Sequence, residues 1–110
     1  MYGTVFHMKI KKGKETQLFK MFQDWDKNRR PKVKGSLGGF MLMPDNKADE
    51  VIGIAIFKDK KTYFANANDP AQDKWYKSMR TLLKEDPQWE DGEYVWGEYT
   101  GPKSYELPLH

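Results

Sequence analysis

The sequence predicts a single α+β domain whose strands and helical regions follow one another in the order β-α-β-β-α-β. Three observations lead to this prediction: an alternating N-terminal segment, two segments with helical spacing of apolar residues, and two adjacent apolar segments separated by a turn. A length of 110 residues suits one domain with one core.

The first strand is predicted over residues 2–10, where larger apolar residues occupy every second position. Because side chains alternate between the two faces of a strand, Phe6 and His7 are expected on opposite faces. Phe6 shares its face with most of the apolar residues of the segment, whereas His7 shares the other face with Val5.

A helix follows the segment KKGKE. Starting from Leu18, the residues Met21, Phe22 and Trp25 come at i+3, i+4 and i+7, so they lie on one stripe of a helix. Pro31 is expected to end this helix, because proline biases the residue before it away from helical angles.

The middle of the chain predicts a hairpin of two strands, residues 35–43 and 51–57, joined by a turn over residues 44–50. Glycine weakens a strand and often marks the close approach of another backbone. We therefore expect Gly38 and Gly39 to lie where a second sheet approaches.

The second helical region is predicted in two pieces, residues 58–68 and 69–85. Asp69 is a candidate N-cap, and Pro70 suits the first helical turn. The apolar face of the longer helix consists of Trp75, Tyr76, Met79, Leu82 and Leu83.

The segment DPQWEDG, residues 86–92, is expected to break the helix, and EYVWGEY, residues 93–99, to form the fourth strand. This order is the ferredoxin-like arrangement. The sequence thus predicts a ferredoxin-like domain over residues 1–98 and a C-terminal extension over residues 99–110.

The charges argue against a nucleic-acid partner. Lysine and arginine number 19 against 16 acidic residues, a net charge of +3, and the two signs are interleaved rather than gathered into one patch. The densest basic segment is KNRRPKVK, residues 27–34. Its cations either complement the C-terminal end of the first helix or contact phosphate.

The composition also limits the chemistry. The chain has no cysteine, which excludes disulfides and thiolate sites, and no metal is expected because His7 and His110 have no partner at ligand spacing. We found no apolar run of about 20 residues and no secretory signal pattern. We therefore expect a cytoplasmic protein that does not cross a membrane.

The two middle strands are apolar or glycine on both faces. An antiparallel sheet with one face in water should instead alternate apolar and polar residues. Two helical regions cover one face only, so the sequence predicts that a second copy covers the other face in a two-fold homodimer.

Three passages of the sequence carry a likeness to a known family: KKGKE at the start of the first helix, RPKVKGSLGGFML, and DPQWEDGEYV. Together they resemble the dimeric α/β-barrel group, which includes antibiotic-biosynthesis-monooxygenase-like domains. The resemblance covers roughly residues 2–98 and points to a functionally unassigned branch of the group. It implies a ligand pocket between the sheet and the helices of each protomer.

The resemblance implies, first, a cofactor-independent monooxygenase-like protein acting on a small aromatic or apolar substrate. Such chemistry needs a base and hydrogen-bond donors for an oxyanion. His7 is the candidate base, Asn66 and Trp75 are candidate donors, and Tyr76 is a candidate pocket wall or proton relay. Candidate substrate-binding residues are Phe6, Phe40, Tyr63, Met79 and Arg80.

Other interpretations stay open. The same pocket could serve a non-catalytic, small-ligand-binding or stress-related dimer. Trp75 and Tyr76 also suit ordinary core packing, and His7 suits a hydrogen-bonded core or interface position. Haem binding or degradation is disfavoured, because the haem-degrading pattern calls for Asn, Trp and His where this chain has Phe6, Asn66 and Tyr76.

Overall fold

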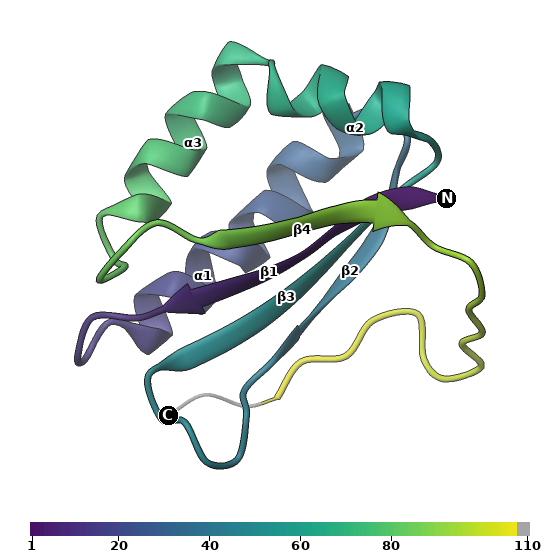
Figure 1. Cartoon of the computed structure of the whole chain (residues 1–110). Helices are drawn as coiled ribbons and strands as arrows, with labels where there is room; N and C mark the ends of the chain where they lie inside the picture. Colours follow the sequence, from purple (N-terminus) through teal and green to yellow (C-terminus); the bar gives the residue numbers. More distant parts are fainter. Residues whose placement is uncertain (108–110) are drawn as a thin grey trace.

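One antiparallel sheet of four strands, in the order β2-β3-β1-β4, forms the base of the molecule (Figure 1). The computed structural model describes residues 1–107. The strand order, with helices between β1 and β2 and between β3 and β4, is ferredoxin-like, so the predicted fold class is confirmed. The strands are β1 (Tyr2–Lys9), β2 (Ser36–Leu42), β3 (Glu50–Phe57) and β4 (Gln88–Glu93).

The helices all lie on the same face of this sheet (Figure 1). Helix α1 (Glu15–Asp24) continues through a π-helical turn, η1 (Trp25–Arg29), and a 3-10 turn, η2 (Arg30–Lys32). The helical path therefore ends within one residue of Pro31, close to the predicted end. The second helical region consists of α2 (Lys60–Ala67) and α3 (Pro70–Arg80).

Local sequence signals set the starts of α2 and α3. Asp59 and Thr62 form a capping box at the start of α2. Asp69 caps α3 by accepting a hydrogen bond of 2.9 Å from the Ala71 backbone N–H, and Pro70 is the first helical residue. The predicted cap and the predicted break between two helices are thus confirmed.

The core lies between the helices and the sheet. Gly53 makes room for it, because a Cβ atom at this position would lie 2.0 Å from Cζ of the Phe6 ring. The apolar face predicted for the long helix is confirmed, since Met79 and Leu83 are buried and its other members pack against them. The buried core residues are Phe6, Met8, Ile10, Leu18, Val51, Met79 and Leu83.

The position of the fourth strand corrects the sequence prediction. The strand was expected over residues 93–99, but β4 is Gln88–Glu93. In the ladder with β1, Trp89 pairs with Phe6 and Glu93 pairs with Tyr2. After Glu93 the chain turns onto the other face of the sheet, where the Tyr94 hydroxyl bonds the carbonyls of Thr4 and Ala55.

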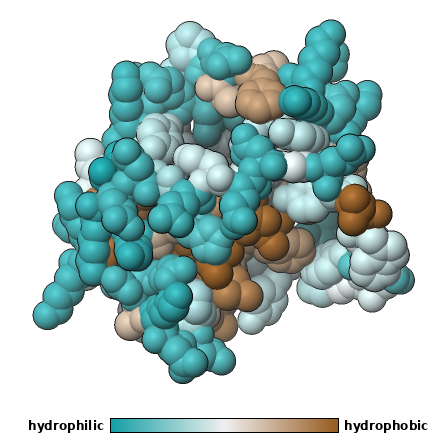
Figure 2. Space-filling model, viewed as in Figure 1, coloured by the Kyte–Doolittle hydropathy of each residue, from teal (hydrophilic) through white to brown (hydrophobic). Residues whose placement is uncertain are grey.

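No helix within residues 1–107 covers the other face of the sheet, and we call it the bare face. Tyr94 crosses part of it, donating its hydroxyl hydrogen bond to the carbonyls of Thr4 and Ala55, and the Tyr99 ring packs edge-on against Phe40. Figure 2 shows hydrophobic residues exposed over β2 and β3. The large residues of the bare face are Val5, His7, Phe40, Leu42, Ile52, Ile54 and Ile56.

Within residues 1–107, none of the helices combines the length and the apolar character needed to cross a membrane.

Candidate functional site

The sheet separates the four candidate catalytic residues. His7 lies on the bare face, as its pairing with Ile52 and its alternation with buried Phe6 require. Asn66, Trp75 and Tyr76 belong to α2 and α3, on the opposite side of the sheet. The structure therefore does not bring His7 together with the other three.

The candidate substrate-binding residues are divided in the same way. Phe6 and Met79 are 6% and 1% exposed and belong to the closed core. Tyr63 lies on the helix side, where its hydroxyl donates a 2.8 Å hydrogen bond to Asp91. Arg80 binds Asp86 and a backbone carbonyl, and Phe40 lies on the bare face with 52% exposure.

Between the helices and the sheet, five rings form a continuous group that we call the aromatic cluster: Phe6, Phe22, Trp75, Tyr76 and Trp89. The ring centroids of Phe22 and Trp75 are 5.1 Å apart in an edge-to-face arrangement, and those of Phe6 and Trp89 are 5.2 Å apart. Trp89, the member on β4, is 46% exposed. The cluster thus extends from the core to the surface beside β4.

Trp75 has an unusual polar atom in this surrounding. Its indole Nε1 is buried, and no residue within 1–107 accepts its hydrogen bond. A buried donor without a partner costs about 1–3 kcal/mol, and such groups in native proteins call for an explanation. An acceptor oxygen of a bound molecule would satisfy this N–H.

Asn66 is held by Arg29, which comes from the π-helical turn. Arg29 Nη2 donates to Oδ1 of Asn66 at 3.1 Å and lies 3.1 Å from Oδ2 of Asp69. The hydrogen bond from the Ala71 backbone and the Arg29 guanidinium together hold the pKa of Asp69 below its ordinary value. Asp69 therefore stays ionised opposite Arg29.

Tyr76 is a donor rather than a base. Burial, followed by the nearby Asp86 carboxylate, raises the pKa of its phenol above the ordinary value. A phenol ordinarily titrates near pH 10, so Tyr76 remains protonated at neutral pH. Its ring also contacts Trp89, with centroids 6.3 Å apart.

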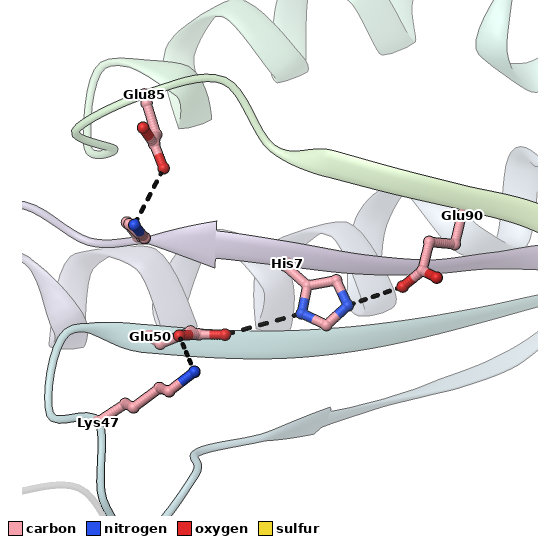
Figure 3. A network of polar contacts seen from close by, with 6 residues as sticks. His7, Lys47, Glu50, Glu85 and Glu90 are labelled. Atoms are coloured by element: carbon pink, nitrogen blue, oxygen red, sulfur yellow. Dashed lines mark hydrogen bonds and ion pairs between the residues drawn. The ribbon is translucent and has the colours of Figure 1, made fainter.

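His7 belongs to a separate polar cluster on the bare face (Figure 3). Its Nε2 lies 2.8 Å from Glu90 Oε2 and its Nδ1 lies 3.7 Å from Glu50 Oε1, so each ring nitrogen faces a carboxylate. Lys47 pairs with Glu50, while Lys9 pairs with Glu85. A hollow of about 200 Å³ is lined by the members of this cluster other than Glu90, together with Met8 and Gln88.

These contacts decide what His7 can do. Both ring nitrogens are already directed at Glu50 and Glu90, and the sheet lies between the imidazole and Trp75. Within residues 1–107, no group of three or more ligating side chains is arranged to hold a metal ion. In this cluster His7 is hydrogen-bonded to Glu90, and the ion pairs are Lys47–Glu50 and Lys9–Glu85. His110, the other histidine, lies outside the described residues.

The basic segment over residues 27–34 has structural partners. The Arg30 guanidinium stacks on the Trp25 ring at 4.9 Å from the centroid and also bonds Asp26 and Ser36. Arg29 is engaged with Asn66 and Asp69 as described above. Both arginines therefore fix the end of the first helix.

Sequence reasoning missed several of these residues. Arg29 could have been found, because it comes four residues after Trp25 and continues the stripe of α1. Glu90 and Trp89 could not, because their faces depend on the register of β4 with β1, in which Trp89 pairs with Phe6. No pattern in the sequence indicated Glu50 as a partner of His7.

Comparison with solved structures identifies the fold. A variant of SnoaB, a cofactor-independent oxygenase from Streptomyces nogalater, aligns with a TM-score of 0.75 and 11% identity over 87% of this chain and 94% of its own. A protein from Caulobacter crescentus, provisionally named as an antibiotic biosynthesis monooxygenase, aligns with a TM-score of 0.75 and 14% identity over 86% and 90% of the two chains. Another of that provisional name, from Nitrosomonas europaea, aligns with a TM-score of 0.71 and 12% identity over 87% and 100%.

The chain has the fold of the antibiotic biosynthesis monooxygenases. The resemblance noted in the sequence is thereby confirmed for the fold. No protein-family model matches the chain, and no curated protein matches its sequence. At such low identity the likeness concerns the fold alone, because one fold can carry many functions.

Proposed function

We propose that this chain is a monooxygenase-like protein of the cofactor-independent kind, which binds a small aromatic or apolar molecule on the helix-covered side of its sheet. The observation that carries the proposal is the buried indole N–H of Trp75, which has no acceptor among residues 1–107 and lies within the aromatic cluster. The rings supply apolar surface, and the N–H supplies a fixed donor, the combination typical of ligand pockets.

The reaction we propose is the oxygenation of an activated C–H bond. Loss of a proton to solvent gives an enolate or phenolate, whose oxygen accepts the hydrogen bond of Trp75 with Asn66 as the second donor. Reaction of the carbanion carbon with O2 and loss of the second hydrogen of the same carbon convert CH2 to C=O, with one oxygen atom kept in the new carbonyl and the other released as water. All four electrons that reduce O2 come from the substrate, so an anthrone becomes an anthraquinone without a redox cofactor.

A homodimer is part of the proposal. The bare face exposes large apolar side chains, including Phe40 at 52% and Leu42 at 56%. Contiguous apolar patches on soluble monomers rarely exceed a few hundred Å². A second copy packed face to face would cover the patch on both chains with one self-complementary surface.

A second candidate function is non-catalytic binding of a small ligand, as in a stress-related dimer. The observation that favours it is the position of His7, the candidate base, which faces Glu50 and Glu90 on the other side of the sheet. Without this base the proton must leave to solvent. A pure binding protein would use Trp75 in the same way but would catalyse nothing.

Oxygen consumption with anthrone tests the proposal. We expect turnover by the intact chain and a loss of about 100-fold in kcat/KM for Trp75→Phe, because this variant keeps a ring but lacks the donor. Trp96→Phe is the matched control, since Trp96 is 79% exposed in the segment after β4, and it should keep full activity.

The outcomes distinguish the two candidates. Absence of turnover, with anthrone binding that weakens only in Trp75→Phe, would establish the binding function instead. Equal behaviour of Trp75→Phe and the intact chain in both assays would refute both.

A further inference from the structure

We infer that Arg29 is a positioning residue for the ligand site. It binds the side-chain oxygen of Asn66, so that the amide N–H groups are left to face the ligand as donors. The inference rests on the proposed function for its meaning in catalysis. The contact itself is a property of the ligand-free protein, so it can be tested separately.

The first step is the packing of α1 and its π-helical extension along α3. Three successive contacts join them and run antiparallel: Phe22 with Trp75, Trp25 with Gln72, and Arg29 with Asp69. The second of these is a 2.8 Å hydrogen bond from the Trp25 indole to Gln72 Oε1. Arg29 and the unpartnered indole of Trp75 thus belong to one line of contacts, which we call the helix seam.

Trp25 and Arg29 are the first and last residues of the π-helical turn. The contacts of Trp25 with Gln72, and of Arg29 with Asn66 and Asp69, show that both side chains face the second helical region. Such single π turns are often associated with functional sites.

The second step is the geometry of the Asn66 amide. Oδ1 of Asn66 accepts a hydrogen bond from Arg29 Nη2 at 3.1 Å. Since a guanidinium has no acceptor, it cannot bind the Nδ2 end of the amide. The planar carboxamide is therefore fixed with its oxygen toward Arg29 and its two N–H donors pointing away.

The third step is the anchoring of Arg29 itself. Its side chain is only 17% exposed, and Asp69 holds the same Nη2 atom at 3.1 Å. Asp69 is fixed in turn by its capping bond with the Ala71 backbone. Hydrogen bonds thus connect the start of α3, through Asp69 and Arg29, to the amide of Asn66.

The polar contacts of Arg29 agree with this assignment. Its buried Nε has no acceptor among residues 1–107, so the two Nη2 contacts, to Asn66 and to Asp69, orient the guanidinium. A donor-presenting seam suits an oxygen-bearing aromatic, such as a phenol or an anthrone, over a plain hydrocarbon.

The side-chain amide signal of Asn66 in a nitrogen–proton correlation spectrum tests the inference without any ligand. We expect Arg29→Gln to shift this signal and to broaden or merge its two proton resonances as the amide begins to rotate. Arg30→Gln is the matched control, because Arg30 leaves the same helix end but bonds Asp26 and Ser36 instead. An Asn66 signal unchanged in Arg29→Gln would overturn the inference.

Kinetics with anthrone distinguish a positioning role from a purely structural one, because only a positioning role is expected to lower kcat while leaving KM nearly unchanged. We expect Arg29→Gln to lower kcat by about 10-fold, below the effect of removing a donor outright, while KM changes less than about 2-fold. Arg29→Lys, which keeps the positive charge opposite Asp69 together with a long donor for Oδ1, should recover part of the loss. Equal losses in Arg29→Lys and Arg29→Gln, or a loss confined to KM, would contradict a positioning role.

Asp69→Asn covers the case in which Arg29→Gln does not fold, because asparagine caps helices as well as aspartate but holds Arg29 more weakly. We expect the same shift of the Asn66 signal, smaller in size, and no shift would overturn the inference. If the intact chain does not oxidise anthrone, the proposed function fails, and the spectra still decide whether Arg29 holds Asn66.

Discussion

The two faces of the sheet are built from the same strands but differ in what covers them. On one face, alternate residues of β1 and β3 meet α1 and α3 in a core whose members, such as Val51 and Leu83, are fully buried. On the other face, no helix within residues 1–107 covers equally apolar residues such as Ile54 and Phe40, and Tyr99, from the segment that follows β4, packs against Phe40. Hydrophobicity alone therefore does not tell which residues are core.

The comparison also separates the polar residues by role. On the helix side, Trp75 and Asn66 provide neutral donors, and the Trp75 donor lacks an acceptor within residues 1–107. On the bare face, His7 is hydrogen-bonded to Glu90, and Glu50 is paired with Lys47. This difference is why we propose the helix side for ligand chemistry and the bare face for self-association.

We expect the largest difference in the free energy of unfolding when the same substitution, leucine to alanine, is made on each face of the sheet. Leu83→Ala removes a side chain with no exposure and should lower the free energy of unfolding by about 2–5 kcal/mol. Leu42→Ala removes one that is 56% exposed and should change the free energy of unfolding of the monomer by less than about 0.5 kcal/mol. Urea unfolding at protein concentrations low enough to exclude association measures both, and comparable losses would remove the distinction.

The next effect concerns association. We expect the intact chain to have about twice the 13.0 kDa mass of a single chain in light scattering. Ile54→Glu should reduce it to the single-chain mass, weakening association at least about 100-fold by burying an unpaired charge, while the circular dichroism spectrum stays unchanged. Gln23→Glu places the same charge on an exposed position of α1 and should leave the dimer intact.

A single-chain mass for the intact protein would contradict the proposed dimer. So would an unchanged mass for Ile54→Glu, since the bare face would then not be the interface.

The smallest expected effect is a pH dependence of the free energy of unfolding, caused by Tyr63 at the edge of the helix side. Burial, followed by the hydrogen bond to Asp91, raises the pKa of Tyr63 well above its ordinary value. Its contribution to stability is thus complete below about pH 10, the ordinary tyrosine value, and is lost as the pH rises and only the unfolded form ionises.

Tyr63→Phe should lower the free energy of unfolding by about 0.5–1.5 kcal/mol at neutral pH, the usual net value of one hydrogen bond. It should also flatten the fall in stability between about pH 9 and pH 11. Urea unfolding across this range measures both effects. Tyr105→Phe, which alters a 72% exposed tyrosine in the segment after β4, is the control and should keep the slope of the intact chain.

Much of the fold could be predicted because its signals are local. Alternation in the first strand placed Phe6 and His7 on opposite faces, and Asp69 with Pro70 marked the start of α3. The fourth strand could not be located, because QWEDGE contains few strand-forming residues. Its position depends on the register with β1, which places Trp89 opposite Phe6 and Glu93 opposite Tyr2.

The candidate site was predictable only in part, for a similar reason. The residue types of Asn66 and Trp75 indicated hydrogen-bond donors. Whether each donor has a partner within the protein depends on contacts between distant segments. Arg29 reaches Asn66 across 37 positions of the chain, and no periodicity encodes such a pairing. The alternation that placed His7 and Phe6 on different faces already separated His7 from the helices, because neighbouring side chains of a strand point to opposite sides of the sheet.

A nitrogen–proton correlation spectrum recorded while 2-naphthol is added follows both faces of the sheet at once. If the helix side takes the ligand, the indole N–H signal of Trp75 moves as its missing acceptor arrives, and the ring signals of His7 stay in place. Movement of the His7 signals with an unchanged Trp75 indole would put the ligand on the bare face and contradict the assignment of function to the helix side.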